Sequence, residues 1–350
     1  MNELMHALIV RAPMDYNVEK TEVPRVPDGG LLLKVLACGL CGSDLRTLRS
    51  GHRKVNFPFT IGHEICGQVV ETGRSYRGNW RKGEILAVSP LVYCGECLFC
   101  RKEQYEFCTG YREIAQAWTG GFSEYIALPE EAIQHGTIQP VPKGMDPVHA
   151  TLVEPLSSCI NAQEKGNIAP GETVLIIGAG PVGTLHLELA RSRGADQIIV
   201  ADISEDRLKL IETFHPDLLI NSSSRDLNEE VLRATNGYGP DVIITANPDP
   251  STLVQSVEIC RKGGRILIFG GLPKDKATPG VNMNTVHYNA LHLIGTTIFA
   301  PRHNAIALQL IMNGKISAGK IISHQLKLSD FNEGTKLALE GKALKIVFLP

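Results

Sequence analysis

The most constraining feature of this sequence is a glycine-rich turn that joins an apolar segment to a segment of helical periodicity. Residues 173–183 read TVLIIGAGPVG, and TLHLELARSRGA follows directly. Gly178, Gly180 and Gly183 have the spacing G-x-G-x-x-G, and residues 197–204, QIIVADIS, supply a second apolar strand. A strand, a glycine turn, a helix and a second strand in this order predict a parallel βαβ unit that binds a dinucleotide at the turn.

The residues of this turn have separate physical roles in such a site. The first glycine permits the tight turn, the second admits the pyrophosphate, the third lets helix and strand pack closely, and the helix N-terminus supplies N–H donors. Asp202 ends the second strand, where its carboxylate can bind both ribose hydroxyls and repel a 2′-phosphate, so we expect NAD rather than NADP. Arg207 is the nearest cation and could weaken that preference. The candidate cofactor-binding residues are Gly178, Gly180, Pro181, Val182, Gly183, Asp202 and Arg207.

The wider pattern predicts an α/β chain with two kinds of domain. After the glycine turn, candidate strands alternate with candidate helices, which predicts a doubly wound parallel sheet. The strands are expected at 218–221, 241–247 and 264–271, and the helices near 204–213, 226–235 and 251–261. Before the turn, short alternating runs punctuated by glycine and proline predict a β-rich domain. These runs lie at 31–39, 67–73, 84–91 and 122–129, and the last residues, ALKIVFLP, predict one more strand.

Four of the nine cysteines lie in CGECLFCRKEQYEFC, with the spacing C-x2-C-x2-C-x7-C. Four thiolates can close a tetrahedral zinc and leave no position for water or substrate, which predicts a structural metal. An iron–sulfur cluster is the alternative, but no proline follows the last cysteine and no second cluster motif is present. The candidate ligands are Cys94, Cys97, Cys100 and Cys108.

Charge and hydropathy exclude several classes of protein. The 35 basic and 37 acidic residues give a net charge of −2, without the basic excess of a nucleic-acid-binding protein, so a zinc-ribbon reading is disfavoured. We find neither a signal peptide nor an apolar stretch long enough to span a membrane. We therefore expect a cytoplasmic protein, in which cysteines stay reduced and clustered thiols bind metal.

A second metal site is suggested by ACGLCGSD (37–44) and TIGHEICG (60–67). Cys41, His63 and Glu64 offer sulfur, nitrogen and oxygen ligands of the kinds that a catalytic zinc uses. The residues alone leave alternatives open, because the His-Glu pair is also compatible with a surface or core pair. Cys38 and Cys66 are equally compatible with small buried hydrophobic residues.

These motifs occur in an order that resembles the zinc-dependent medium-chain dehydrogenase/reductase family. The resemblance rests on CGLCGSD, GHE, the four-cysteine lobe, GAGPVG and VEPLS (153–157), and VEPLS resembles the sorbitol/polyol dehydrogenase branch. It implies a GroES-like catalytic domain at 1–152, including a structural zinc lobe at 90–110, and a Rossmann NAD-binding domain at 153–287. Residues 288–350 would then return to the catalytic domain.

The resemblance also implies roles for individual residues. Cys41, His63 and Glu154 match the catalytic-zinc positions, Glu64 is a direct or alternating ligand, and Ser43 binds the substrate oxygen. Two zinc ions per chain are implied, one catalytic and one structural. Zinc then activates an alcohol as a Lewis acid, and NAD accepts the hydride. Because Glu154 precedes a proline, we expect it in extended backbone near the domain junction.

The implied function is oxidation of a secondary alcohol in a polyol or sugar alcohol to a ketose or ketone. Relatives often carry a histidine where this chain has Arg46, so water or His52 must complete the proton relay. The basic run from Arg46 to Lys54 is either a solvated loop or a phosphate clamp. A clamp implies a phosphorylated substrate, as in galactitol-phosphate relatives. The candidate substrate residues are Arg46, Arg49, His52, Trp118 and Arg302.

Other readings remain at this point. Threonine and butanediol dehydrogenases are cousins of the same branch, and an NAD-binding sensor without catalysis is the non-enzyme alternative. The resemblance implies a homodimer or homotetramer, and neither nucleic acid nor membrane is expected as a partner.

Overall fold

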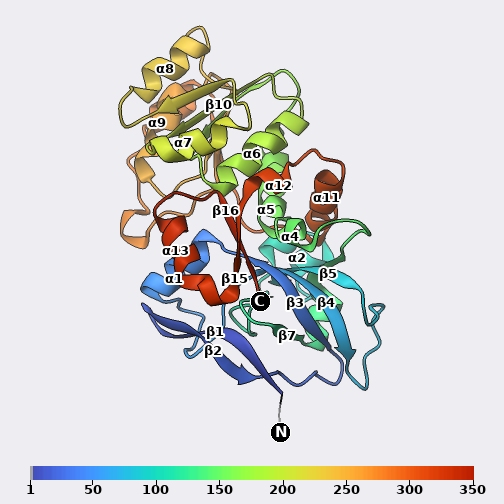
Figure 1. Ribbon diagram of the computed structural model, residues 1–350. Coiled ribbons are helices and arrows are strands. Elements are labelled where there is room, and N and C mark those ends of the chain that lie inside the picture. The colour runs from blue at the N-terminus through green and yellow to red at the C-terminus, as the bar shows by residue number, and fades with distance from the viewer. Residues whose placement is uncertain (1–2) are drawn as a thin grey trace. The chain divides into compact units, whose positions relative to one another are not determined.

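The structure, a computed structural model, describes residues 3–350 and divides the chain into two compact units (Figure 1). Unit 1 contains the chain up to Ser157 together with Phe299–Gly314 and Ala318–Pro350. Unit 2 contains Ser158–Ile298 and Lys315–Ser317. Among the described residues, no helix combines the length and hydropathy needed to cross a bilayer.

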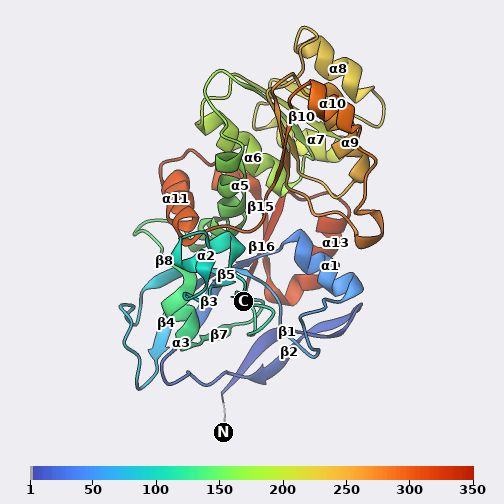
Figure 2. The ribbon, with the colours of Figure 1, turned by 180° about the vertical axis from the view of Figure 1, so that it is seen from behind.

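Unit 2 is built on a six-stranded parallel sheet in the order β11-β10-β9-β12-β13-β14, with helices packed around it (Figures 1 and 2). Its central strands are apolar runs without exposed positions, as a sheet covered on both faces requires. The strands are β9 (Thr173–Ile177), β10 (Gln197–Asp202), β11 (Leu218–Asn221), β12 (Val242–Thr245), β13 (Arg265–Ile268) and β14 (His292–Gly295). The helices are α6 (Pro181–Ser192), α7 (Glu205–Glu212), α8 (Leu227–Ala234), α9 (Pro250–Ile259) and α10 (Met283–Tyr288), with a 3-10 turn at Lys274–Lys276.

The strand order of unit 2 reverses direction at β9, which pairs with β10 on one side and with β12 on the other. Ligands of open α/β sheets bind at the carboxyl ends of the strands at such a reversal. The glycine turn follows β9 at this edge and therefore lies where a dinucleotide is expected.

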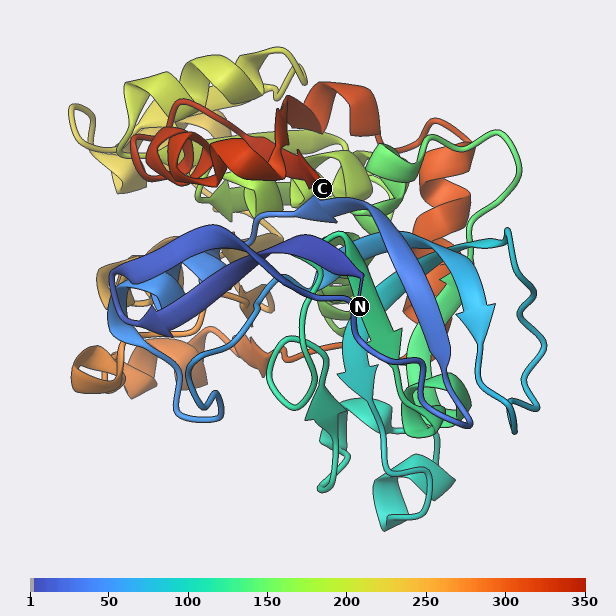
Figure 3. The same cartoon turned by 60° about the horizontal axis from the view of Figure 1, so that its bottom comes forward.

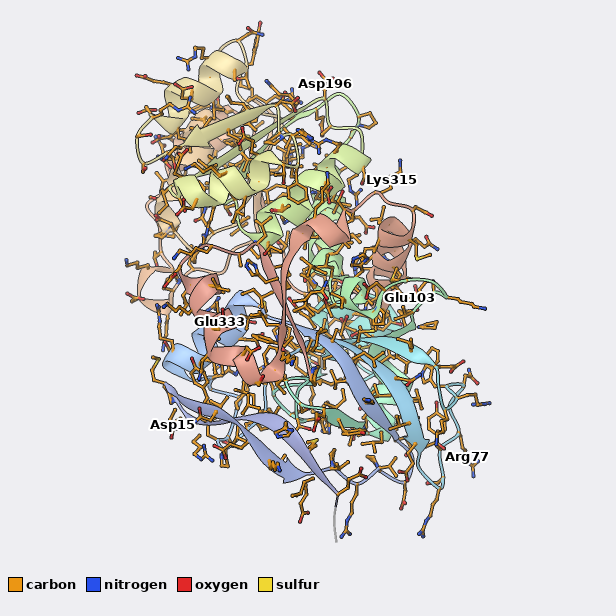
Figure 4. All side chains as sticks on the ribbon, in the orientation of Figure 1. Asp15, Arg77, Glu103, Asp196, Lys315 and Glu333 are labelled. Carbon is orange, nitrogen blue, oxygen red and sulfur yellow. The ribbon has the colours of Figure 1, made fainter. Side chains whose placement is uncertain are left out.

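Unit 1 is built on an eight-stranded sheet, in which β15-β16-β3-β4-β5-β6 follow one another, β7 pairs with β3 and β8 pairs with β5. Its strands are β3 (Leu31–Gly39), β4 (Glu64–Thr72), β5 (Ile85–Val92), β6 (Arg112–Glu113), β7 (Tyr125–Leu128), β8 (Gly136–Pro140), β15 (Ile322–Lys327) and β16 (Lys345–Leu349). The separate hairpin of β1 (Leu4–Ala12) and β2 (Asp15–Glu22) is dark blue in Figure 3, and Figure 4 labels Asp15 at its turn.

The helices of unit 1 are short except for two. They are α1 (Gly42–Ser50), α2 (Leu98–Arg101), α3 (Glu130–His135), α4 (Pro147–Ala150), α11 (Pro301–Met312), α12 (Ala318–Ile321), α13 (Phe331–Leu339) and the first residues of α5 (Val153–Lys165), which continues into unit 2, with 3-10 turns at Tyr105–Phe107 and Leu328–Asp330. Phe122, Phe331 and Phe348 form an aromatic cluster in the core, with ring centroids 4.7 to 5.6 Å apart. Phe348 belongs to β16, so the C-terminal strand completes both the sheet and the core of this unit.

The structure differs from two sequence expectations. Glu154 does not lie in extended backbone but in the first turn of α5, where Pro155 is tolerated because the first N–H groups of a helix have no intrahelical partner. The compact units also divide at 157/158 and 298/299 rather than at the predicted 152/153 and 287/288. The first boundary falls inside continuous helix α5, and the second falls after β14, which belongs to the parallel sheet.

Candidate functional site

The four-cysteine lobe follows β5 and projects from the rest of unit 1 in Figure 3, with Glu103 labelled in Figure 4. The Sγ atoms of Cys94, Cys97, Cys100 and Cys108 all lie within 4.8 Å of one another. The Sγ of Cys94 is 3.8 Å from that of Cys100 and 3.5 Å from that of Cys108. Four sulfurs held about 2.3 Å from one zinc are roughly 3.8 Å apart, so this set fits a tetrahedral zinc.

Backbone N–H groups point at the sulfurs of this lobe. Cys97 is the N-cap of α2, and its sulfur accepts the N–H of Cys100 at 3.4 Å. Hydrogen bonds from the N–H groups of Cys100 and Thr109 lower the pKa of Cys97 to about 6, whereas burial raises the pKa of Cys100 to about 12. The lobe is therefore partly prepared to present thiolates, and a bound metal would deprotonate the remaining thiols.

A second cluster forms where β3 ends and β4 begins. These strands are antiparallel neighbours with Gly39 opposite Glu64, so the residues just after β3 and just before β4 meet. The ligand atoms of Cys41, His63 and Glu64 lie within 4.8 Å of one another. Cys41 is the N-cap of α1, and Glu64 is the first residue of β4. Sulfur, imidazole and carboxylate in one cluster form a donor set that fits a catalytic zinc.

Asp44 supports this cluster and was not identified from the sequence. One of its carboxylate oxygens lies 3.3 Å from Nδ1 of His63, and the other accepts the N–H of Cys41 at 3.0 Å. Burial alone would lower the pKa of His63, but the Asp44 carboxylate and the Cys41 sulfur together raise it well above its ordinary value. A carboxylate on one ring nitrogen orients the ring and fixes its tautomer, as in many metal sites.

Glu154 lies near the cluster but outside its 4.8 Å group. Part of its surface remains exposed, yet the surrounding protein removes enough hydration to raise the pKa of Glu154 to about 7. His63 opposes this rise, and the Glu64 carboxylate adds to it, so all three groups are within electrostatic reach. The structure therefore brings this acid to the same region of unit 1 as Cys41.

The remaining predicted substrate residues lie on several elements of unit 1. Ser43, Arg46 and Arg49 are exposed on α1, Trp118 is half-buried, and Arg302 is exposed in the first turn of α11. The ring of Trp118 stacks on the guanidinium of Arg112 at 4.5 Å. This contact accounts for Trp118 without a substrate.

Glu113 is a second residue that the sequence analysis missed. Its carboxylate lies 3.8 Å from Nζ of Lys54 and accepts a hydrogen bond from Gln116 at 2.6 Å. Burial lowers the pKa of His52, and Glu113 opposes that shift. Glu113 also contributes to the raised pKa of Glu154. Glu113 is thus within electrostatic reach of His52 and Lys54 in the basic run and also of Glu154.

The glycine turn of unit 2 has the geometry that its motif predicts. A Cβ on Gly183 would lie 1.8 Å from the carbonyl oxygen of Gly178, whereas a Cβ on Gly180 would meet nothing within 4 Å. The lack of a side chain at Gly183 lets α6 pack closely against the turn. The open space around Gly180 leaves room for a pyrophosphate in front of the N-terminus of α6.

Asp202 and a cavity lie at the carboxyl ends of different strands of the unit 2 sheet. The buried carboxylate of Asp202 accepts the N–H groups of Ala179 at 2.7 Å and of Ser204 at 2.9 Å. Arg207 is half-buried in the first turn of α7. A cavity of about 320 Å³ follows the carboxyl ends of β13 and β14, where Phe269 and Thr296 help to line it.

Comparison with known proteins identifies the family. Residues 27–139 match the model of the alcohol dehydrogenase GroES-like domain, and residues 181–313 match the zinc-binding dehydrogenase model. An L-threonine 3-dehydrogenase of Pyrococcus horikoshii is 33% identical over 100% of this chain and 99% of its own length. The chain belongs to the zinc-dependent medium-chain dehydrogenases. The predicted family, its enzyme class and the combination of a GroES-like domain with a Rossmann sheet are therefore confirmed.

Two further relatives of this zinc-dependent dehydrogenase bear on its cofactors and substrates. An erythritol/L-threitol dehydrogenase of Mycolicibacterium smegmatis is 30% identical over 99% of this chain and 98% of its own length. The NADP-bound structure of a protein described as a zinc-binding dehydrogenase, from Sinorhizobium meliloti, has a TM-score of 0.91 at 28% identity. It covers 99% of this chain and 100% of its own. Zinc and a nicotinamide cofactor are thus properties of the family to which the chain belongs.

Proposed function

We propose that this dehydrogenase oxidises a secondary alcohol of a polyol to a ketone and transfers the hydride to NAD. The observation that carries the proposal is the convergence of Cys41, His63 and Glu64 in unit 1, with Glu154 nearby. The name of the erythritol/L-threitol relative supports a polyol as the substrate. The name of the Pyrococcus relative keeps threonine in the set of compounds to test.

In this proposal Cys41, His63 and Glu154 hold the catalytic zinc, and Glu64 is a direct or alternating ligand. Bound there, zinc supplies a Lewis acid for the alcohol oxygen. Asp44 keeps the His63 ring in the orientation that presents its other nitrogen to the metal. The four-cysteine lobe holds a structural zinc, because all four of its donors are protein sulfurs.

Ser43 is the proposed first acceptor of the alcohol proton. It lies two residues after Cys41 on α1, and its exposed side chain can pass the proton to water. Arg46 cannot titrate at useful pH, so it does not take part in the relay. Water or His52 completes the relay in this proposal, and burial lowers the pKa of His52, which makes its ring a weaker proton acceptor than an ordinary histidine.

The proposed cofactor site comprises Gly178, Gly180, Pro181, Val182, Gly183, Asp202 and Arg207. The buried Asp202 carboxylate is fixed by two backbone N–H groups, so its negative charge stays at the tip of β10. That charge disfavours a 2′-phosphate and supports NAD over NADP. Arg207 follows Asp202 by five residues, and its positive charge can reduce the preference for NAD over NADP without reversing it.

The direct test is NADH formation with free polyols, their phosphate esters, 2,3-butanediol and threonine, measured side by side. We expect turnover of a free polyol in the wild-type protein. Cys41→Ser should abolish turnover and lower bound zinc from two ions to one, while NADH binding persists. Cys260→Ala, which changes a buried cysteine in unit 2, is the matched control. Full activity in Cys41→Ser would refute the proposed zinc site.

Two exposed arginines support a second candidate, a phosphorylated polyol. Arg46 and Arg49 lie on the same helix as Ser43, and guanidinium groups match phosphate oxygens in a fork geometry. Replacing both with alanine should then raise KM for the phosphate ester, by roughly tenfold per arginine, and leave KM for the free polyol unchanged. Equal effects on both substrates would count against a phosphate clamp.

We also propose a homodimer or homotetramer in the cytoplasm. The described residues of β14 pair only with β13, so β14 is an edge strand of the parallel sheet. An edge strand can pair with a strand of a second copy, which supports association. Support for the compartment is the four-cysteine lobe, which requires reduced thiols. Sedimentation of the purified protein tests the first point, since a monomer at micromolar concentration would contradict it.

A further inference from the structure

Lys345, the first residue of β16, is a buried lysine beside the Cys41 cluster. Its side chain is only 3% exposed, and a lysine this deep in a protein requires acceptors for its ammonium group. Nζ donates to Oε1 of Glu64 at 2.6 Å and to the carbonyl oxygen of Leu40 at 2.9 Å. It also forms an ion pair with Oε2 of Glu64. The ammonium group thus makes two hydrogen bonds and one ion pair beside the proposed zinc ligands, and among the described residues Oε2 of Glu64 has no hydrogen-bond partner.

The surroundings of Glu64 leave its carboxylate little freedom. It is 1% exposed, and a Cβ on Gly39 would lie 2.0 Å from Oε2, so the backbone of β3 closes one side. On another side Lys345 contacts both carboxylate oxygens. A metal held by Cys41 and His63 can bind Glu64 only through an oxygen that it shares with an ammonium group.

We propose that Lys345 is a positioning residue that competes with zinc for Glu64 and so keeps Glu64 an exchangeable ligand. The inference rests on the proposed zinc site. The ammonium group withdraws electron density from the carboxylate and repels a divalent cation nearby. Zinc is then held mainly by Cys41, His63 and Glu154. When Glu64 leaves the metal, its buried carboxylate is still paired with Lys345.

Lys345 also contacts the backbone next to a second proposed zinc ligand, Cys41. Leu40, whose carbonyl oxygen it binds, directly precedes Cys41, and the N–H of Leu40 donates to the carbonyl of Ile346 at 2.9 Å. Strand β16 therefore holds the peptide before Cys41 on both its N–H and its C=O side. Lys345 thus contacts Glu64 and also the residue that directly precedes Cys41.

The alternative role for Lys345 is to orient Glu64 so that it binds zinc more tightly. Partners of metal ligands usually orient them, and their loss weakens metal binding about 10- to 100-fold. Competition predicts the reverse sign, because removal of the lysine leaves zinc as the only cation available to Glu64. The sign of the change in zinc affinity therefore separates the two roles, and it is measured without turnover.

The experiment is chelator competition for zinc at the Cys41 site, using the full chain with its four-cysteine zinc retained. We expect Lys345→Met to lower the zinc Kd by about tenfold because it removes a charge that repels the metal, Lys345→Arg to keep the wild-type value, and Lys342→Met, an exposed neighbour, to have no effect. In the Glu64→Gln background, Lys345→Met should no longer tighten zinc binding. If Lys345→Met does not fold, Lys345→Gln takes its place with the same expected direction.

The outcomes separate this inference from the proposed function. A wild-type protein that binds only the four-cysteine zinc refutes the proposed zinc site and this inference with it. A wild-type protein with two zinc ions, together with unchanged or weaker binding in the neutral Lys345 variant, refutes the inference alone. Tightening that persists in the Glu64→Gln background also refutes it, because Glu64 would then not be the shared ligand.

Discussion

A buried histidine makes the stability of unit 2 depend on pH in a calculable way. His186 lies inside α6 with no exposed surface, and its ring packs edge-on against Phe269 at 4.7 Å. The side-chain amide of Gln163 donates to the His186 carbonyl at 2.8 Å and lies 3.2 Å from Nδ1, so Nδ1 accepts and Nε2 carries the proton. Within the described chain Nε2 has no hydrogen-bond partner. Burial lowers the pKa of His186 to about 3.

The sign of the effect follows from proton binding in the two states. The unfolded chain takes up this proton near pH 6.5, whereas the folded chain does so only near pH 3. Between these values the unfolded state binds more protons, so the free energy of unfolding decreases as the pH falls below 6.5. The slope approaches about 1.4 kcal/mol per pH unit, which gives about 2 kcal/mol between pH 7 and pH 5.

The assay is urea unfolding of wild type and His186→Leu at pH 7 and pH 5, followed by far-UV circular dichroism. Between pH 7 and pH 5, we expect the free energy of unfolding to fall by about 2 kcal/mol less in His186→Leu than in wild type. This difference does not depend on the stability of the variant at pH 7. His287→Leu is the matched control, because this histidine of unit 2 is exposed. Equal losses in wild type and His186→Leu would show that the ring is not held neutral in the folded state.

Two further predictions test the cofactor and metal sites. Gly183→Ala should abolish NAD binding and keep both zinc ions, because its Cβ would lie 1.8 Å from the carbonyl oxygen of Gly178. Gly280→Ala is the control and should bind NAD normally, because a Cβ on Gly280 would meet no atom within 4 Å. NAD binding is measured by calorimetry, and normal binding by Gly183→Ala would contradict the packing argument. Asp44→Ala should weaken zinc at the His63 site about 10- to 100-fold and leave the four-cysteine zinc in place. Zinc titration tests this, and an unchanged affinity would show that Asp44 does not position the ring.

The nucleotide-binding unit was predictable because its determinants are local. The apolar runs of β9 and β10, and the glycine turn between them, specify the fold over about thirty consecutive residues. The β1–β2 hairpin was missed for a physical reason. None of the side chains of β2 is buried, so the strand lacks the apolar alternation by which strands are recognised.

The supporting residues of the metal cluster could not be predicted from the sequence. Cys41 and His63 stand in short motifs, but Asp44 acts on His63 through a fold that brings the ends of β3 and β4 together. Lys345 acts on Glu64 across 281 positions of the chain. A lone lysine in an apolar strand carries no signal of its partner, because long-range pairing is decided by the register of β16 with β3.

The error at Glu154 has a consequence for the site. The rule that a residue before proline avoids helical backbone competes with the tolerance of proline in the first turn of a helix, and here the second effect prevails. Glu154 therefore projects from a helix and not from a loop, just as Cys41 stands at the N-cap of α1 and Glu64 at the start of β4. Each group is anchored by regular structure whose hydrogen bonds do not involve a metal. The cluster should accordingly persist when zinc is removed, so that zinc binding measures the ligands and their partners and not the folding of the domain.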